Sequence, residues 1–367
     1  MAAGHSLLTD VKSGNTGAVT SARGCDTFLI LHDYPSPEVD KLWREFLNRV
    51  DCPSHYDAPE YFLEPYWIGK RPFAVLAIDN SGRVIGVLTG LHLRGRVVCG
   101  LPARPQIRTD DTSSAILASD RLAEGLLQEA GREKLIAVFA WSGLSLPGFQ
   151  RRGFLCREFA GDIVLDLRMG TDNLFKQLHE SRRRNIRNAI RNGVEVSEAT
   201  TPEDTAAYWR VYSAWRRTER KVIRHDHSFA MIERVHSLRA NHRRFLARYN
   251  GQVIAATGIR FLKGGLVEYA NNCSLNEFMH LRPNDLLMWR TVQWACEQGF
   301  PKYSMGGADS FHRRSGGTVV PVCRYRLDRT FLHRHDFKES IRARARLFLE
   351  KAPAGMGQVI RKLLGRS

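Results

Sequence analysis

The sequence lacks any apolar run of the roughly 20 residues that a helix needs to cross a bilayer. Residues 1–24 are rich in Gly, Ser, Thr and Ala and lack the apolar core of a secretory signal, so we expect a disordered leader there. No membrane span is expected. We therefore expect a cytoplasmic protein, either free or held peripherally at the inner face of the membrane.

Cysteine spacing also excludes some classes of protein. The seven cysteines are odd in number, scattered, and never spaced as a C-x-x-C pair, which argues against a disulfide framework and a zinc site. A His-x-His triplet at His225 and His227 has no third ligand in register. We therefore expect no metal and no tightly bound cofactor.

Acidic residues are outnumbered by basic ones. The chain carries 55 Lys and Arg against 38 Asp and Glu, a net charge of +17 with a pI near 9.9. Such a surface attracts an anionic partner, whether nucleic acid, a phosphorylated donor or an acidic membrane. Residues 181–191 hold five arginines and no acid, and this run is either part of such a surface or a solvated helix face.

Two distant stretches of the chain have similar sequences. Residues 75–85 reappear as residues 245–254, and each reads as a β-hairpin. Leu93-Arg94-Gly95 precedes Leu262-Lys263-Gly264 by 169 positions, and a later helix repeats at an offset of 165. A chain of 367 residues suits two domains of about 150 residues, so the repeat predicts an internal duplication.

Each half reads as a helix, a meander of antiparallel strands, a second helix and further strands. The predicted parts are a leader at 1–24, a first domain at 25–167, a second domain at 168–335 and a basic tail at 336–367. The second domain is predicted to open with one basic helix over 171–192. The tail is either an amphipathic helix on an anionic membrane, making contact through residues 338–367, or a segment packed on the second domain.

Three local patterns then carry a resemblance. The first is the basic helix at 181–189 ending at Gly193-Val194, the second covers 284–299, and the third runs from Tyr303-Ser304-Met305-Gly306-Gly307 to Phe311–Gly317. Their order resembles the GNAT acyltransferase superfamily, and two such units in tandem resemble the Fem-type aminoacyltransferases that build peptidoglycan bridges. The resemblance covers roughly residues 170 to 330.

The resemblance implies an α/β (α+β) fold of two tandem GNAT-like domains, each a mixed, mostly antiparallel sheet flanked by helices. It implies transfer of an acyl or aminoacyl group to an amine acceptor in cell-envelope or polysaccharide metabolism. The donor would be an acyl-CoA, an acyl-carrier thioester or an aminoacyl-tRNA, and no DNA partner is expected. The Gly-rich pyrophosphate loop of CoA-dependent members is missing between Cys273 and Leu286, which argues against CoA.

Three residues are catalytic candidates. Glu268 and Tyr269 share a predicted strand with opposite facings, so only one of them can point into a cleft. Glu268 would act as a base through water, and Tyr269 would donate to the leaving group. Asp309 follows a predicted strand end and would hold an amino group. The alternative is that Glu268 and Tyr269 are ordinary strand residues with no role in the reaction.

Six residues are substrate-binding candidates. His312 stands where the family commonly has a Lys after the Phe, with Arg313 and Arg314 beside it, and the three offer a clamp for phosphate or carboxylate groups. The others are Tyr303, Asn271 and Arg183. Asp285 is expected to cap its helix instead.

A second function stays open, that of a catalytically degenerate GNAT scaffold binding RNA or an anionic membrane surface. Its features are the arginine helix and an aromatic cluster at Tyr208, Trp209, Tyr212 and Trp215. The same helical spacing is typical of core packing. In the acyltransferase interpretation, residues 168–335 hold the reaction centre and the first copy forms the other wall of the cleft.

Overall fold

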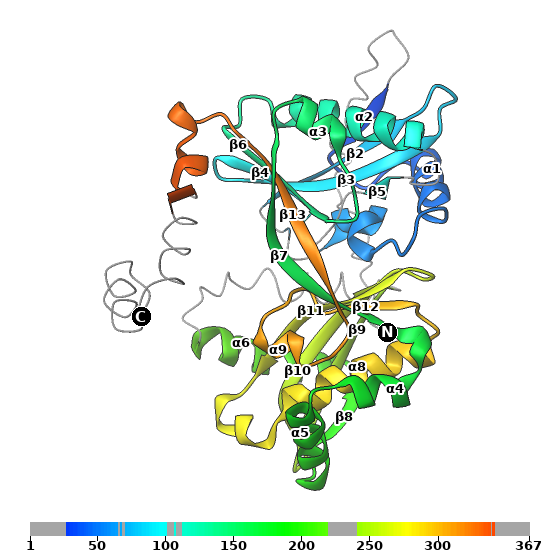
Figure 1. The fold of residues 1–367 in the computed structure, drawn as a ribbon. Coiled ribbons are helices and arrows are strands. Elements are labelled where there is room, and N and C mark those ends of the chain that lie inside the picture. The colour runs from blue at the N-terminus through cyan, green and yellow to red at the C-terminus, as the bar shows by residue number, and fades with distance from the viewer. Residues whose placement is uncertain are drawn as a thin grey trace, which may run out of the picture.

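The computed structural model describes residues 27–64, 67, 70–100, 106–107, 112–218, 241–338 and 340–341. The predicted leader, the His225–His227 triplet and most of the basic tail lie outside these residues. In the described part of the chain, none of the helices has both the length and the apolar character to span a membrane. Two lobes are joined by a single continuous 13-stranded sheet (Figure 1).

The first lobe is built on an antiparallel meander covered by helices. The predicted hairpin is present as β2 and β3, which pair in antiparallel register. The elements in chain order are β1 (Phe28–Leu31), α1 (Pro37–Leu47), the 3-10 turns His55–Asp57 and Pro59–Leu63, β2 (Arg71–Ile78), β3 (Val84–Leu93), β4 (Arg96–Cys99), β5 (Gln106–Ile107), α2 (Thr112–Ala130), β6 (Leu135–Trp141), α3 (Pro147–Arg151), β7 (Leu155–Asp166) and a 3-10 turn at Leu167–Met169.

The second lobe repeats this plan, with the hairpin β9–β10 in place of β2–β3. The prediction of two units with the same plan, each a mostly antiparallel sheet flanked by helices, is therefore confirmed. The elements are α4 (Thr171–Gln177), α5 (Glu180–Arg191), β8 (Glu195–Glu198), α6 (Pro202–Thr218), β9 (His242–Tyr249), β10 (Gln252–Phe261), β11 (Leu266–Ser274), a 3-10 turn at Asn276–Leu281, α8 (Pro283–Glu297), β12 (Lys302–Ser304), α9 (Ser310–Arg313), β13 (Thr318–Asp328) and a 3-10 turn at Phe331–His333.

The prediction of one basic helix over 171–192 is wrong. The chain leaves the helical conformation at Leu178 (ψ 141°) and His179 (ψ 142°), which separates α4 from α5. Leu178 is buried in the core, and the Nδ1 atom of His179 accepts a hydrogen bond from the Ser181 backbone as the N-cap of α5. Burial of Leu178 and this cap therefore replace a continuous helix with two shorter ones.

Two long strands exchange partners between the halves. β13, from the second half, pairs with β6 of the first, while β7, from the first half, pairs with β12 of the second. β7 and β13 also pair with each other in antiparallel register and run from one lobe to the other (Figure 1). These pairs join strands from before and after the predicted domain boundary at 167/168. The strand pairing therefore does not mark that boundary, which stays a prediction.

Strand register decides which side chains face the first lobe. Val267, Tyr303 and Leu165 lie side by side on β11, β12 and β7 and fill the core beneath α8. Their neighbours Glu268 and Ser304 also lie side by side, on the opposite face of the sheet. That face points toward the first lobe.

A close approach of backbones docks the first lobe onto the β10–β11 hairpin. The Leu266 backbone N–H donates to the Pro53 carbonyl at 2.9 Å. A Cβ atom at Gly265 would lie 2.0 Å from that carbonyl oxygen, so only glycine fits there.

A buried ion-pair network joins the lobes beside this contact. The Arg260 guanidinium on β10 holds Glu64 of the first lobe through two hydrogen bonds of 2.9 and 2.8 Å. His55 Nε2 lies 3.0 Å from the same carboxylate, and Asn241 contacts the other ring nitrogen of His55 at 2.8 Å. All four side chains are buried, so the network fixes how the lobes meet.

Candidate active site

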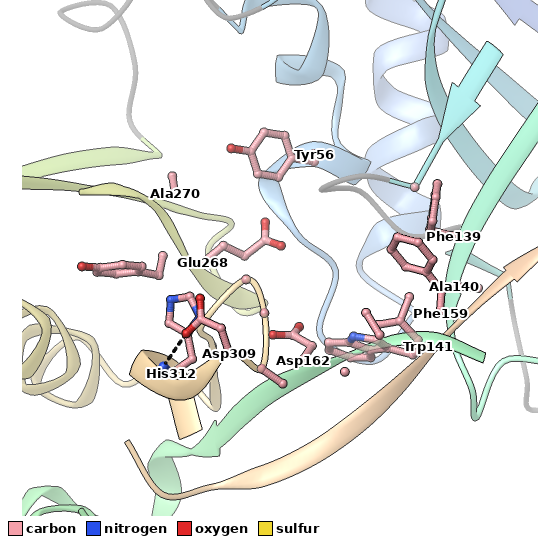
Figure 2. Close-up of a pocket in the computed structure, with 18 of the residues that line it drawn as sticks. Tyr56, Phe139, Ala140, Trp141, Phe159, Asp162, Glu268, Ala270, Asp309 and His312 are labelled. Carbon is pink, nitrogen blue, oxygen red and sulfur yellow. Dashed lines mark hydrogen bonds and ion pairs between the residues drawn. The ribbon is translucent and has the colours of Figure 1, made fainter. Parts of the chain in front are cut away.

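A cavity of about 680 Å³ lies between the lobes, where β6, β7, β11 and the chain after β12 meet. One wall is aromatic, formed by Phe139, Trp141 and Phe159. The facing side is polar. Figure 2 shows the Glu268 carboxylate projecting into this space, with Tyr56 on one side of it and Asp162 and Asp309 on the other.

The cavity opens where two parallel strands part. β12 pairs with β11 only from Leu266 to Glu268, and β11 then continues to Ser274. Beyond Ser304 the chain leaves β11 but stays bonded to β7, since the Met305 N–H donates to the Ile163 carbonyl and the Ile163 N–H to the Gly307 carbonyl. The first residues of β11 beyond Glu268 therefore border the cavity.

Strand β11 also carries a β-bulge beside the cavity. The register between β10 and β11 shifts between Gly258 and Ile259, so Ala270 is the extra residue. A bulge twists a strand and re-aims its side chains. Ala270 itself lines the cavity.

Glu268 and Tyr269 face opposite sides, as the alternation of the strand predicts. Glu268 is 3% exposed and projects into the cavity. The Tyr269 side chain turns toward α9, where its ring meets the His312 ring edge-on at 6.1 Å between centroids, although Tyr269 also borders the cavity. Burial raises the pKa of the Tyr269 phenol. Of the two, Glu268 is the side chain placed to act as a base.

Asp162 is a site residue that the sequence analysis missed. It lies on β7, is 3% exposed and accepts a hydrogen bond of 2.7 Å from the Ser304 hydroxyl. The Gly306 N–H in turn donates to the Ser304 oxygen at 3.2 Å. One signal was available, since Gly161-Asp162 interrupts an apolar strand with a charge. The structure thus brings two carboxylates, Asp162 and Glu268, to one cavity.

Asp309 and His312 form a small unit at the cavity rim. Asp309 caps α9, because its Oδ1 atom accepts hydrogen bonds from the backbone N–H groups of Phe311 and His312. The same oxygen lies 3.2 Å from His312 Nδ1. Burial lowers the pKa of His312 despite this carboxylate, so the neutral imidazole is favoured at neutral pH.

The three basic candidates after Phe311 differ in position. His312 and Arg313 border the cavity. Arg314 does not, and its guanidinium lies over the Phe311 ring at 5.8 Å.

The segment around α9 is held from below by Arg182. This buried guanidinium donates to the Ser315 hydroxyl at 2.7 Å and to the Phe311 carbonyl at 2.6 Å, and its Nε atom lies 3.2 Å from Asp285. Burial lowers the pKa of Arg182 to about 10. The predicted cap role of Asp285 is wrong, because it lies within α8 and accepts hydrogen bonds from neither end of that helix but from Asn185 at 2.9 Å.

Three further predicted substrate-binding residues, like Arg314, do not border the cavity. Tyr303 is fully buried in the core, and its hydroxyl lies 2.8 Å from that of Thr291, which leaves no surface for a substrate. Asn271 donates to the Tyr208 hydroxyl, and Arg183 on α5 donates to the Lys176 carbonyl. Among the described residues no group of three His, Cys, Asp or Glu side chains is placed to hold a metal ion.

Comparison with known proteins agrees with this architecture. Residues 180–314 match the family model of the acetyltransferase (GNAT) domain. No curated protein matches the chain in sequence.

Several solved structures share the fold over most of their length. FemX is 14% identical, with 82% of this chain and 97% of FemX covered at a TM-score of 0.59. The C-terminal domain of a putative lysylphosphatidylglycerol synthetase from Agrobacterium fabrum is 12% identical, with 80% and 93% covered at 0.56. A tandem GNAT protein from the clavulanic acid biosynthesis pathway is 11% identical, with 83% and 99% covered at 0.50. The chain therefore has the fold of these proteins, and its second half carries the GNAT domain.

Proposed function

We propose that this protein transfers an acyl or aminoacyl group to an amine acceptor in the cavity between the lobes. One observation carries the proposal: two buried carboxylates, Glu268 and Asp162, face a cavity at the point where β11 and β12 part. Acyl transfer to an amine needs a base for the ammonium group, and a buried carboxylate that faces the cavity can serve as one.

The reaction divides the work between these groups. Glu268 takes one proton from the acceptor ammonium, and the free amine then attacks the acyl carbonyl of the donor. Asp162, oriented by Ser304, holds the attacking nitrogen. As the tetrahedral intermediate collapses, the new amide forms, the bond to the leaving oxygen or sulfur breaks, and the second proton of the nitrogen passes to that atom. The aromatic wall limits access of water to the acyl group.

The start of α8 bears on the donor. A helix N-terminus favours a bound pyrophosphate, but α8 begins at Pro283, which has no N–H, and carries Asp285 in its first turn. A carboxylate there competes with an anionic ligand. This supports an aminoacyl-tRNA or an acyl-carrier thioester over acyl-CoA as the donor.

A second cavity supports an entry path for the acceptor. It has a volume of about 700 Å³ and is lined by Val164 of β7 and Val320 of β13, whereas Asp162 and Val322 line the first cavity. Alternate residues of a strand share a face, so both cavities lie along one face of the crossing strands, and Trp141 borders both. The name of one relative, a lysylphosphatidylglycerol synthetase, supports an acceptor in the cell envelope.

The donor is tested by incubating the purified protein with charged tRNAs, acyl-carrier thioesters and acyl-CoAs and following loss of each donor by mass spectrometry. Consumption of a donor only when an amine acceptor is present supports the proposal. If no donor is consumed in the presence of a broad amine panel, while RNA binds in a salt-dependent manner, the binding-scaffold alternative is favoured.

Asp162→Asn is expected to lower kcat by about 100-fold, because the amide keeps the shape but loses the charge that holds the attacking nitrogen. The measurement is steady-state kinetics with the donor identified above. Asp172→Asn is the matched control, since Asp172 is exposed on α4 and borders neither cavity. Full activity of Asp162→Asn would remove this residue from the mechanism.

The aromatic cluster gives little support to the RNA-binding alternative. Tyr208 and Tyr212 stack at 5.9 Å between ring centroids, and Trp209 and Tyr212 at 5.6 Å. Tyr208 is buried in a small core with Leu246. These rings thus pack on one another and on the sheet, as their helical spacing predicts.

A further inference from the structure

The three most exposed large apolar side chains of the described residues lie in one short segment after β13, and a fourth exposed apolar side chain, Ile341, follows them. Phe331 is 85% exposed, Leu332 75%, Phe337 65% and Ile341 51%. We call these four residues the apolar tip. Figure 1 shows their segment, coloured orange to red, beside the end of the first lobe that carries β4 and β6. Apolar side chains this exposed within eleven residues mark an interaction surface.

The tip stands on a well-anchored base. The buried Asp328 carboxylate accepts hydrogen bonds from Thr330 through both its N–H and its hydroxyl, and from the backbone N–H groups of His335 and Asp336. Asp336 also pairs with Arg326. The exposed side chains therefore project from a turn that is fixed to the end of the sheet.

The backbone at the tip is strained. Leu332 has φ 54° and His333 has φ 46°, in the left-handed region that non-glycine residues seldom adopt. This turn directs Phe331 and Leu332 into solvent, where they gain little burial against the described residues. A contact outside the chain would compensate for both costs.

The charges around the tip identify its partner. Arg329, Arg334 and Lys338 are exposed beside the apolar side chains, and Asp336 is already paired. The rest of the sequence, residues 339–367, adds seven Lys and Arg residues and two acidic residues. A protruding group of Phe and Leu side chains ringed by cations suits the interface of an anionic bilayer, where the rings enter the headgroup region and the cations meet lipid phosphates.

We propose that the apolar tip docks the protein onto an anionic lipid surface. The contact does not depend on the reaction proposed above. Neither the apolar side chains nor the three flanking cations border the cavity between the lobes.

The test is co-sedimentation of the full chain with vesicles of phosphatidylcholine alone or with about 30% phosphatidylglycerol. The wild type is expected to bind only the anionic vesicles, and the variant Phe331→Ser with Leu332→Ser to bind them at least about tenfold more weakly. Ile190→Ser is the matched control, since Ile190 is 53% exposed on α5, far along the chain from the tip, and its loss should change nothing. Glu268→Gln should bind vesicles as the wild type does, which separates this proposal from the catalytic one.

Three outcomes would overturn the proposal. One is wild-type protein that ignores anionic vesicles or binds neutral ones equally well, and another is a double variant that binds as the wild type does. The third is light scattering that shows a wild-type dimer and a monomeric double variant, because the tip would then bind a second copy of the chain. If the double variant misfolds by circular dichroism, Phe337→Ser supplies the same test.

Discussion

Glu268→Gln is expected to lower kcat by about 10²–10⁴-fold, the range that a general base contributes. The amide has nearly the same shape as the carboxylate and can occupy the same place between the lobes, but it cannot accept a proton from the attacking amine. Glu268 is the carboxylate of β11 that projects into the cavity, so the effect should fall on turnover more than on donor binding.

The measurement is a pair of pH–rate profiles with donor and acceptor at saturation. The wild type should lose activity on the acid side as its base becomes protonated, whereas the residual activity of Glu268→Gln should lack that limb. Glu195→Gln, at an exposed position on β8, is the control and should match the wild type. An unchanged kcat in Glu268→Gln would show that another group carries the proton.

The duplication was readable from the sequence because hairpins are local. Residues 75–85 and 245–254 each carry their turn and both strands in one stretch, and the structure confirms them as β2–β3 and β9–β10. The alternation of side chains along a strand also predicted that the Glu268 and Tyr269 side chains would point to opposite faces of the sheet. Patterns set by neighbouring residues were therefore the reliable part of the prediction.

Non-local features could not be predicted in this way. The pairing of β7 with β13 places Thr318 beside Val164. No local sequence pattern predicts which distant strand becomes the neighbour of a given strand. Asp162 is oriented by a hydrogen bond from Ser304, a residue of another strand. Asp285 pairs with Arg182 and does not cap its helix. Each of these outcomes depends on a partner more than 100 positions away.

The buried network at Glu64 yields the second large effect. Arg260→Met is expected to lower the free energy of unfolding by about 3–5 kcal/mol, because it leaves a buried carboxylate without its bidentate partner. Glu64 and Arg260 come from different lobes, so the loss should also loosen the contact between them. Urea unfolding followed by circular dichroism measures the change.

Arg248→Met is the matched control on the neighbouring strand. Arg248 pairs with Asp204, but the two side chains are 27% and 14% exposed, so this ion pair is partly open to water and should contribute only about 1 kcal/mol. Equal losses from the two variants would contradict the view that burial sets the cost.

The effect should also depend on pH. Burial opposes ionisation of Glu64, but Arg260 and His55 hold its pKa well below its usual value of 4.5. A depressed carboxyl pKa contributes stability that is present above the unfolded-state value and is lost as the pH falls toward the folded-state value. The difference in stability between wild type and Arg260→Met should therefore narrow as the pH falls below 4.5.

Removing both charges separates the cost of an unpaired charge from the value of the pair. Glu64→Gln combined with Arg260→Met leaves no buried ion, so the double variant should be more stable than Arg260→Met alone. Recovery of most of the loss would mean that the pair adds little net stability and that its main effect is to select one arrangement of the lobes. A double variant at least as unstable as Arg260→Met would contradict this, and would mean that the hydrogen bonds of the network themselves stabilise the fold.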